Sequence, residues 1–415
     1  MFCFENRKTI FEGVDSRFKF VVLTFEKSAI PRLQQTGEAN ASAPPDDLLA
    51  PQAVEEANGG GTQRFPAAFM RHDVAELTRF PDEGALWLNV ELIKRLAPDS
   101  YSIMEFKSQL DIHIAEKMLK FPLLGEQRPG EWNLRLCQEF NMTTDSHLFK
   151  TEPGPGRLPL WEGKQFHQFD ANFAKPRYWL DEKAARAELI SPRIKAVRRE
   201  LVKLGINDEP DPGCIQLNYD SYRMAFRDVA ASTNERTVIA TVLPPKRFCP
   251  HTVSLEQVYY DVVTVQGHSS KPSLQPAERL YITSIFNSHV VDSFIRQSVT
   301  AHVSFFFVYN IPVPRLSASD PRFRLIVNRA AHLTCTTPEF DDLAQAVSLK
   351  SHQDGATDPA ERARLRAELD GLVAHLYGLT ETEFAHILST FPLVSTAVKV
   401  DALNAYRRVA SGLVK

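Results

Sequence analysis

The chain has 415 residues, of which 43% are hydrophobic and 24% are charged, and its formal net charge is -3. This length is enough for two or three domains, each able to bury its own core. The slightly acidic balance excludes nucleic-acid binding through overall charge, so any such role must rest on a local basic patch. We find no signal peptide, and the apolar run at 303–311 is far too short to span a membrane. We therefore expect a soluble, cytoplasmic protein with no membrane partner.

The cysteines give no sign of a metal site or a disulfide framework. They are five in number, scattered, and without a CxxC pair, which is typical of reduced thiols in a cytoplasm. Cys249 and His251 flank Pro250, but two such residues without a second pair nearby are a weak signal, and we assign no metal.

The first strong secondary-structure signal is the run RFKFVVLTFEK at 17–27, whose β-branched and aromatic residues predict a strand. A strand of this strength needs neighbours, and only a short candidate precedes it. We therefore expect residues 1–30 to be the closing strands of a larger sheet. Residues 31–65 contain Pro44-Pro45 and Gly59-Gly60-Gly61, which predict a linker.

Residues 72–84 and 87–120 carry mixed helical patterns. An amphipathic helix is expected around 111–119, and the segment 132–149 begins as an alternating strand. The segment 158–179 mixes aromatic residues with cationic and amide side chains, a pattern that suits base stacking and phosphate contact. Aromatic residues at this density also build cores, which is the favoured alternative here. The candidate DNA-contacting residues in this segment are Lys164, His167, Gln168 and Arg177.

A short basic run at 193–203 predicts a helix with a cationic face. Spacings of three and four place its lysines and arginines on roughly one side. A solvated helix face is the common alternative. The residues are Lys195, Arg198, Arg199 and Lys203.

The stretch YRMAFRDVAASTNERTVIATVLPP at 222–245 carries the second set of candidates. Its apolar run at 238–243 predicts a buried strand that Pro244-Pro245 ends, and a polar loop precedes it. A polar loop held between ordered segments is a common place for recognition residues. The alternatives are a surface loop with a Glu235 to Arg236 charge pair, and a structural pairing of Arg227 with a nearby acid such as Asp228. The candidates for DNA contact are Arg223, Arg227, Thr233, Asn234, Arg236 and Thr237.

The C-terminal part of the chain is predominantly helical in pattern. Residues 280–297 predict a helix, and 302–314 predict a buried strand that ends at two prolines. Asp358 and Pro359 then read as the cap and first residue of a helix that Gly378 closes. Thr380 is positioned to cap the next helix, so we expect a helical hairpin that braces the fold.

No catalytic triad and no Gly-rich phosphate loop can be identified, so the residues by themselves predict a soluble mixed α/β protein with a possible nucleic-acid surface. Several further stretches, however, carry a resemblance when they are taken together. They are FENRKTIF at 4–11, FNMTTDSHLF at 140–149, PLWEGKQFHQFD at 159–170, FRDVAASTNERTVIATVLPP at 226–245, the FNSHVVDSF to IPVP segment at 286–314 and the ending at 361–392. In this order they resemble the C-terminal half of large adenine-specific DNA methyltransferases of the single-chain, type IIG-like and phage-defence kinds. The first stretch, with the strand after it, is similar to the end of their methyltransferase domain, the last resembles their helical tail, and the four between look like their target recognition domain.

The resemblance implies an α+β fold in four parts: closing methyltransferase strands at 1–30, a linker at 31–65, a target recognition domain at 66–315 and a helical region at 316–415. It also implies double-stranded DNA as a partner and adenine-N6 methylation as the reaction served. The family's Asn-Pro-Pro-Tyr-type motif and Gly-rich cofactor loop are missing, because neither Pro44-Pro45 nor Pro244-Pro245 has the required neighbours.

We therefore expect this chain to bind no cofactor and to be inactive alone, with S-adenosylmethionine held by a catalytic methyltransferase half or subunit. The chain would be the specificity half of such an enzyme, translated separately or cut short. The alternative is a non-enzymatic specificity subunit of a multi-subunit restriction or defence complex, and a third possibility is a gene remnant without activity.

Overall fold

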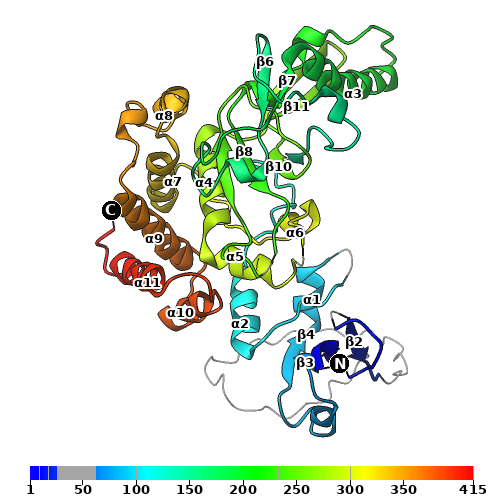
Figure 1. Ribbon diagram of the computed structural model, residues 1–415, viewed down its shortest axis with the longest axis vertical. Coiled ribbons are helices and arrows are strands. Elements are labelled where there is room, and N and C mark those ends of the chain that lie inside the picture. Colours follow the sequence, from blue (N-terminus) through cyan, green and yellow to red (C-terminus); the bar gives the residue numbers. More distant parts are fainter. Residues whose placement is uncertain are drawn as a thin grey trace, which may run out of the picture. The chain divides into compact units, whose positions relative to one another are not determined.

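The computed structural model describes residues 1–8, 10–16, 18–25, 62–98, 101–231, 233–299 and 301–414 (Figure 1). The chain has a mixed α+β fold, as the sequence predicts. It divides into two compact units, Met1–Ile112 and His113–Lys415, and the division falls within helix α2 (Gln109–Met118). No helix in the described ranges is both long and apolar enough to cross a membrane.

The first unit is built on a four-stranded sheet with the order β2-β1-β3-β4. β1 (Phe2–Glu5) pairs antiparallel with β2 (Lys19–Val22) and parallel with β3 (Arg64–Arg71), which pairs antiparallel with β4 (Leu86–Asn89). Phe2 and Phe4 share one face because strand side chains alternate, and their rings lie 4.7 Å apart over the buried Ala68. The Asn89 side chain caps α1 (Val90–Leu96).

These pairings change the expected boundaries. Residues 66–112 were expected in the recognition domain, but β3 and β4 complete the sheet of the N-terminal strands, so this segment belongs to the first unit. Of the strand expected at 17–27, Lys19–Val22 form β2, and residues 17, 26 and 27 lie outside the described residues. Of the expected linker, residues 31–61 lie outside the described residues, and β3 begins at Arg64.

The second unit is centred on a four-stranded antiparallel sheet with the order β5-β10-β8-β9. The strands are β5 (Leu136–Cys137), β10 (Val253–Glu256), β8 (Arg223–Arg227) and β9 (Ala240–Leu243), and β9 ends at Pro244-Pro245 as expected. Helix α4 (Pro276–Asn287) covers β8 and β9, with the Phe286 ring 5.7 Å from that of Phe226. The strand expected from Trp132 is limited to the two residues of β5.

A second core is formed by two antiparallel strand pairs and a long helix. β6 (Arg157–Leu160) pairs with β7 (Tyr178–Asp181), and β11 (Tyr259–Thr264) pairs with β12 (Gly267–Pro272). Helix α3 (Glu182–Lys203) packs Val197 and Leu201 into their common core. Arg193 of α3 is fixed to Asp261 of β11 by a 2.9 Å hydrogen bond from its Nε.

The run at 302–314 is not the strand that its β-branched and aromatic residues predict. Residues Phe305–Tyr309 form the short helix α6, and Pro312 after it forms an isolated antiparallel bridge with Leu123. Leu124 N donates to Ile311 O at 2.8 Å, and Val313 N donates to Pro122 O at 2.9 Å. Tertiary packing of this run thus overrides its strand propensity.

The C-terminal helices lie against α4 and α5 (His289–Arg296) in Figure 1. They belong to the second unit instead of forming the separate region expected at 316–415. The expected caps are confirmed, because Asp358 accepts the backbone N–H of Glu361 and Thr380 forms a capping box with Glu383. The helices are α7 (Pro321–Thr334), α8 (Asp341–Ala346), α9 (Pro359–Leu376), α10 (Glu381–Ser389) and α11 (Thr396–Ala410).

Two features explain the close packing of this tail. A Cβ on Gly371 would lie 2.8 Å from the backbone N of Tyr406, so only glycine lets α9 and α11 approach this closely. The Arg329 guanidinium of α7 also bonds the buried Glu368 carboxylate of α9 at 2.8 Å. These contacts pack α7, α9 and α11 closely together within the second unit.

Candidate nucleic-acid interface

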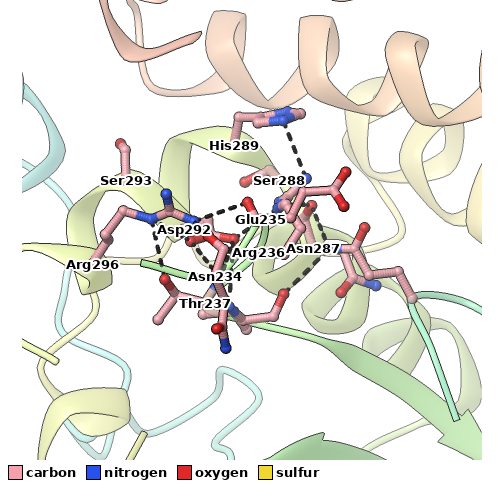
Figure 2. A network of polar contacts seen from close by, with 12 residues as sticks. Asn234, Glu235, Arg236, Thr237, Asn287, Ser288, His289, Asp292, Ser293 and Arg296 are labelled. Atoms are coloured by element: carbon pink, nitrogen blue, oxygen red, sulfur yellow. Dashed lines mark hydrogen bonds and ion pairs between the residues drawn. The ribbon is translucent and has the colours of Figure 1, made fainter. Parts of the chain in front are cut away.

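The loop between β8 and β9 is held by Asp292, a fully buried carboxylate on α5 (Figure 2). Arg236 Nε donates to Asp292 Oδ2 at 2.7 Å, and the Thr237 backbone N–H donates to both carboxylate oxygens at 3.1 Å. A buried carboxylate is stable only when paired and hydrogen-bonded. These bonds therefore fix the loop at Arg236 and Thr237.

Arg296, one helical turn after Asp292, holds the other side of the loop. Its Nη2 donates to the carbonyl oxygens of Asn234 and Glu235 at 2.9 and 3.0 Å, and its Nε donates to Thr237 Oγ1 at 3.1 Å. The Arg296 guanidinium also lies 4.2 Å from the ring centroid of Phe391. Arg296 is thus the second side chain of α5, after Asp292, that binds the backbone of the loop.

His289 connects the loop to the helical tail. Arg236 Nη1 lies 3.3 Å from His289 Nε2, and His289 Nδ1 lies 2.8 Å from Asp370 Oδ2 of α9. Burial raises the pKa of the Asp370 carboxyl, but the hydrogen bonds from His289 and the nearby charge of Arg236 outweigh this effect and hold the pKa below its ordinary value. Loop, α5 and α9 therefore form one polar network.

This network changes the role of two predicted DNA-contacting residues. The Arg236 side chain is only 10% exposed and Thr237 is buried, and both are bonded to Asp292. The alternative of a Glu235 to Arg236 pair is not formed either, because the carboxylate partner of Arg236 lies 56 residues away in the sequence. In this arrangement both residues position the loop and do not face a ligand.

The tip of the same loop is exposed to solvent. Thr233 and Asn234 are exposed, and Asn234 N donates to Ala231 O at 3.0 Å in a turn. Because Arg296 binds the Asn234 carbonyl, the backbone is held while the Asn234 side chain stays exposed. A fixed backbone with an exposed amide is a suitable base-reading arrangement.

Arg223, another candidate, is fully buried and serves the sheet. Its Nη2 donates to the Arg247 carbonyl and lies 3.3 Å from Glu139 Oε2. Burial raises the pKa of the nearby Cys249 thiol to about 12, so the thiol is neutral. The prediction of a DNA contact for Arg223 is therefore corrected to an internal role, because strand β8 is covered on both faces.

Arg227 follows on the same strand but is only partly buried. Its Nη2 donates to Phe166 O at 2.5 Å, and its guanidinium lies 5.7 Å from the Phe166 ring centroid. The expected alternative, a pair with Asp228, is not formed, since Asp228 bonds His302 at 2.8 Å. Burial lowers the pKa of Arg227, which makes no ion pair with a carboxylate in the described part of the chain.

The aromatic segment at 158–179 is mostly core, as the alternative interpretation had it. Trp161 and Phe166 are buried, and Gln168 is buried with its amide donating to Val238 O at 3.2 Å. Gln168 therefore supports the β8–β9 loop instead of meeting DNA. His167 is half-buried; its burial and the charges of Arg227 and Arg366 lower its pKa to about 4.

Lys164 and Arg177 in that segment are exposed, as a DNA contact requires. Both lie near the Glu162 carboxylate, with N to O distances of 3.7 and 3.2 Å. Arg177 also stacks on Tyr178, with its guanidinium carbon 4.4 Å from the ring centroid. On α3, Lys195 and Arg199 are exposed, whereas Arg198 and Lys203 pair with Glu209 and Glu200.

The sequence interpretation missed the partners that hold the loop. Asp292 and Arg296 are spaced by four residues on α5, which is a visible helical pair, but nothing local shows that they bind a loop from another part of the chain. Asn287 was missed as well. Its side chain donates to Ala240 O and accepts from Ala240 N, both at 2.9 Å. Asn287 thus satisfies the two backbone groups of Ala240 that a neighbouring strand would otherwise bond.

Comparison with protein-family models gives no match, and comparison with curated proteins gives none. A solved structure similar to this chain is that of the Type IIL restriction-modification enzyme MmeI in complex with DNA. The sequence identity is 13% and the TM-score is 0.37. The match covers 85% of this chain and 42% of that chain, so this chain spans less than half the length of that enzyme. At this degree of likeness, functional inference for this chain rests on its own residues.

Proposed function

We propose that this chain recognises double-stranded DNA for site-specific adenine-N6 methylation in a restriction-modification or phage-defence system of the cytoplasm. The observation that carries the proposal is the β8–β9 loop, where Thr233 and Asn234 are exposed on a backbone that Arg296 and Asp292 hold fixed. The order of the recognition-domain motifs along the sequence supports it. The exposed cations Lys164 and Arg177 share the single Glu162 carboxylate, so this group keeps a net positive charge for phosphate contact.

The proposed chemistry requires a catalytic methyltransferase half or subunit. This sequence has no Asn-Pro-Pro-Tyr-type motif to hold an extruded adenine, so S-adenosylmethionine would be bound by that partner. We propose that strand β2 and the residues beside it face this partner. β2 lies at the edge of its sheet among the described strands, and Val21, Leu23 and Phe25 beside that edge are exposed.

Replacing Asn234 by Ala should weaken binding to a preferred duplex by about 1–3 kcal/mol and relax the preference at one base position. The reason is that an exposed Asn amide can bond both edge atoms of an adenine, which Ala cannot. Fluorescence anisotropy with the full chain can measure both effects, using the preferred duplex and its single-position variants.

Glu235→Gln is the matched control, because it changes the neighbouring exposed side chain and leaves the Asn234 amide in place. It should leave the base preference unchanged. Unchanged affinity and preference in Asn234→Ala would remove the loop tip from the DNA surface and contradict the proposed role of this loop.

A further inference from the structure

The turn at residues 166–170 is enclosed by cationic side chains from two other elements. The turn is closed by backbone hydrogen bonds between His167 and Asp170, and Phe169 has a left-handed φ of 56°. Arg227 of β8 donates to Phe166 O at 2.5 Å, and Arg362 of α9 donates to Phe169 O at 3.2 Å. The guanidinium groups of one residue on the sheet and one on the helical tail therefore both bond this tight turn.

These guanidinium groups bond neutral oxygens only. Arg362 donates to the carbonyls of Leu333, Ala356 and Phe169, and Arg227 to that of Phe166. Arg366, one turn further along α9, is exposed and makes no hydrogen bond or ion pair with any residue the structure describes. Partial burial lowers the pKa of Arg227 and Arg362, as expected for positive charge without a carboxylate partner.

The charge around the turn is therefore unbalanced. Arg227, Arg362 and Arg366 carry three positive charges, and Asp170 is the one acid that acts on Arg362 and Arg366. Arg236, whose charge also reaches Arg366 and His167, is neutralised by Asp292. Unpaired, partly buried arginines are costly unless an anion joins them, and guanidinium groups are well suited to phosphate.

We propose that Arg227, Arg362 and Arg366, with His167 of the enclosed turn, form a binding site for one backbone phosphate of the DNA duplex. This proposal rests on the proposed function and names a contact that serves it. Arg366 is the free, exposed donor, and Arg227 and Arg362 add charge from fixed positions. His167 lies among these charges, so a bound phosphate would favour its protonated form. The site adjoins the base of the β8–β9 loop through Arg236, so the phosphate would set the register of that loop on DNA.

The first test compares Arg366→Ala with Arg364→Ala in the full chain, on a labelled duplex of scrambled sequence. Arg364 is the matched control, because it is also exposed on α9 but is already paired with Glu368 at 2.8 Å. Arg366→Ala should weaken binding about tenfold at low salt and reduce the slope of log affinity against log salt by about 0.9. Arg364→Ala should leave the slope unchanged. Equal slopes for wild type, Arg366→Ala and Arg364→Ala would overturn the proposal while leaving DNA binding intact.

The second test follows the His167 ring by NMR, with inorganic phosphate or the duplex as the probe. A phosphate at this site should raise the pKa of His167 from about 4 toward the ordinary histidine value of about 6.5, so duplex binding should strengthen as pH falls through this window. The groups facing His167 are Arg227, Arg366, Arg236 and Asp170.

The two tests separate failure of the site from failure of the proposed function. If the duplex and phosphate both leave the His167 pKa unchanged, the site is absent. If inorganic phosphate raises it and the duplex neither binds nor raises it, the site is not for DNA and the proposed function fails with it. The expected result is that both probes raise the pKa of His167 in wild type and in Arg364→Ala. Neither probe should raise it in Arg366→Ala.

Discussion

Replacing Asp292 by Ala should lower the free energy of unfolding of the second unit by about 3–5 kcal/mol, because it leaves buried cations without their counter-charge. Asp292 is fully buried, pairs with Arg236 at 2.7 Å and accepts the Thr237 N–H. Urea unfolding followed by tryptophan fluorescence can measure the loss. Three of the four tryptophans, Trp132, Trp161 and Trp179, lie in the second unit.

The control for Asp292→Ala is Glu235→Gln, which alters an exposed acid of the same loop and should change stability by less than about 0.5 kcal/mol. Combining Asp292→Ala with Arg236→Ala should destabilise less than the sum of the two changes, since the second removes a cation that the first leaves unpaired. Simple additivity, or a loss below about 1 kcal/mol for Asp292→Ala, would contradict the account of the loop.

Glu256→Ala should also lower the free energy of unfolding by about 3–5 kcal/mol, because it leaves a buried cation without its counter-charge. Both Glu256 and its partner Arg279 are buried, and the pair is bidentate, with distances of 2.6 and 2.7 Å. Glu256 Oε2 also accepts the Met224 backbone N–H at 2.9 Å. The pair thus joins α4 to the middle of the sheet that carries the recognition loop.

Glu256→Gln should lower the free energy of unfolding less than Glu256→Ala does, because the amide oxygen can still accept hydrogen bonds. Glu200→Gln on α3 is the control, since this exposed acid pairs only with the exposed Lys203. The same urea titration measures all three variants. Equal effects for Glu256→Ala and Glu200→Gln would show that the buried pair does not hold the sheet and helix together.

The features that the sequence predicted correctly are those encoded locally. Asp358 and Thr380 cap their helices through residues three positions away, and Pro244-Pro245 stops β9 directly. The helical pattern at 280–297 is confirmed as α4 and α5, and the break between them falls at Ser288, which also caps α5. Such signals lie within a few residues of the element they control.

The features that the sequence did not predict depend on distant partners. Arg236 looked like a surface base reader because Asp292 is 56 residues away, and the link from His289 to Asp370 spans 81 residues. Phe305–Tyr309 has strand-forming residues, yet it is helical because its neighbours bond the segment near Leu123. A side chain's type shows what it can bind, but burial decides whether it faces a ligand.

Selection from a pool of random duplexes would show whether this chain reads DNA sequence. The full chain is mixed with the pool, the bound duplexes are recovered at about 200 mM salt to suppress non-specific binding, and they are sequenced. We predict that wild type enriches a shared motif, and that Asn234→Ala enriches the same motif with one position relaxed. Recovery of duplexes without any shared motif would contradict the proposed function.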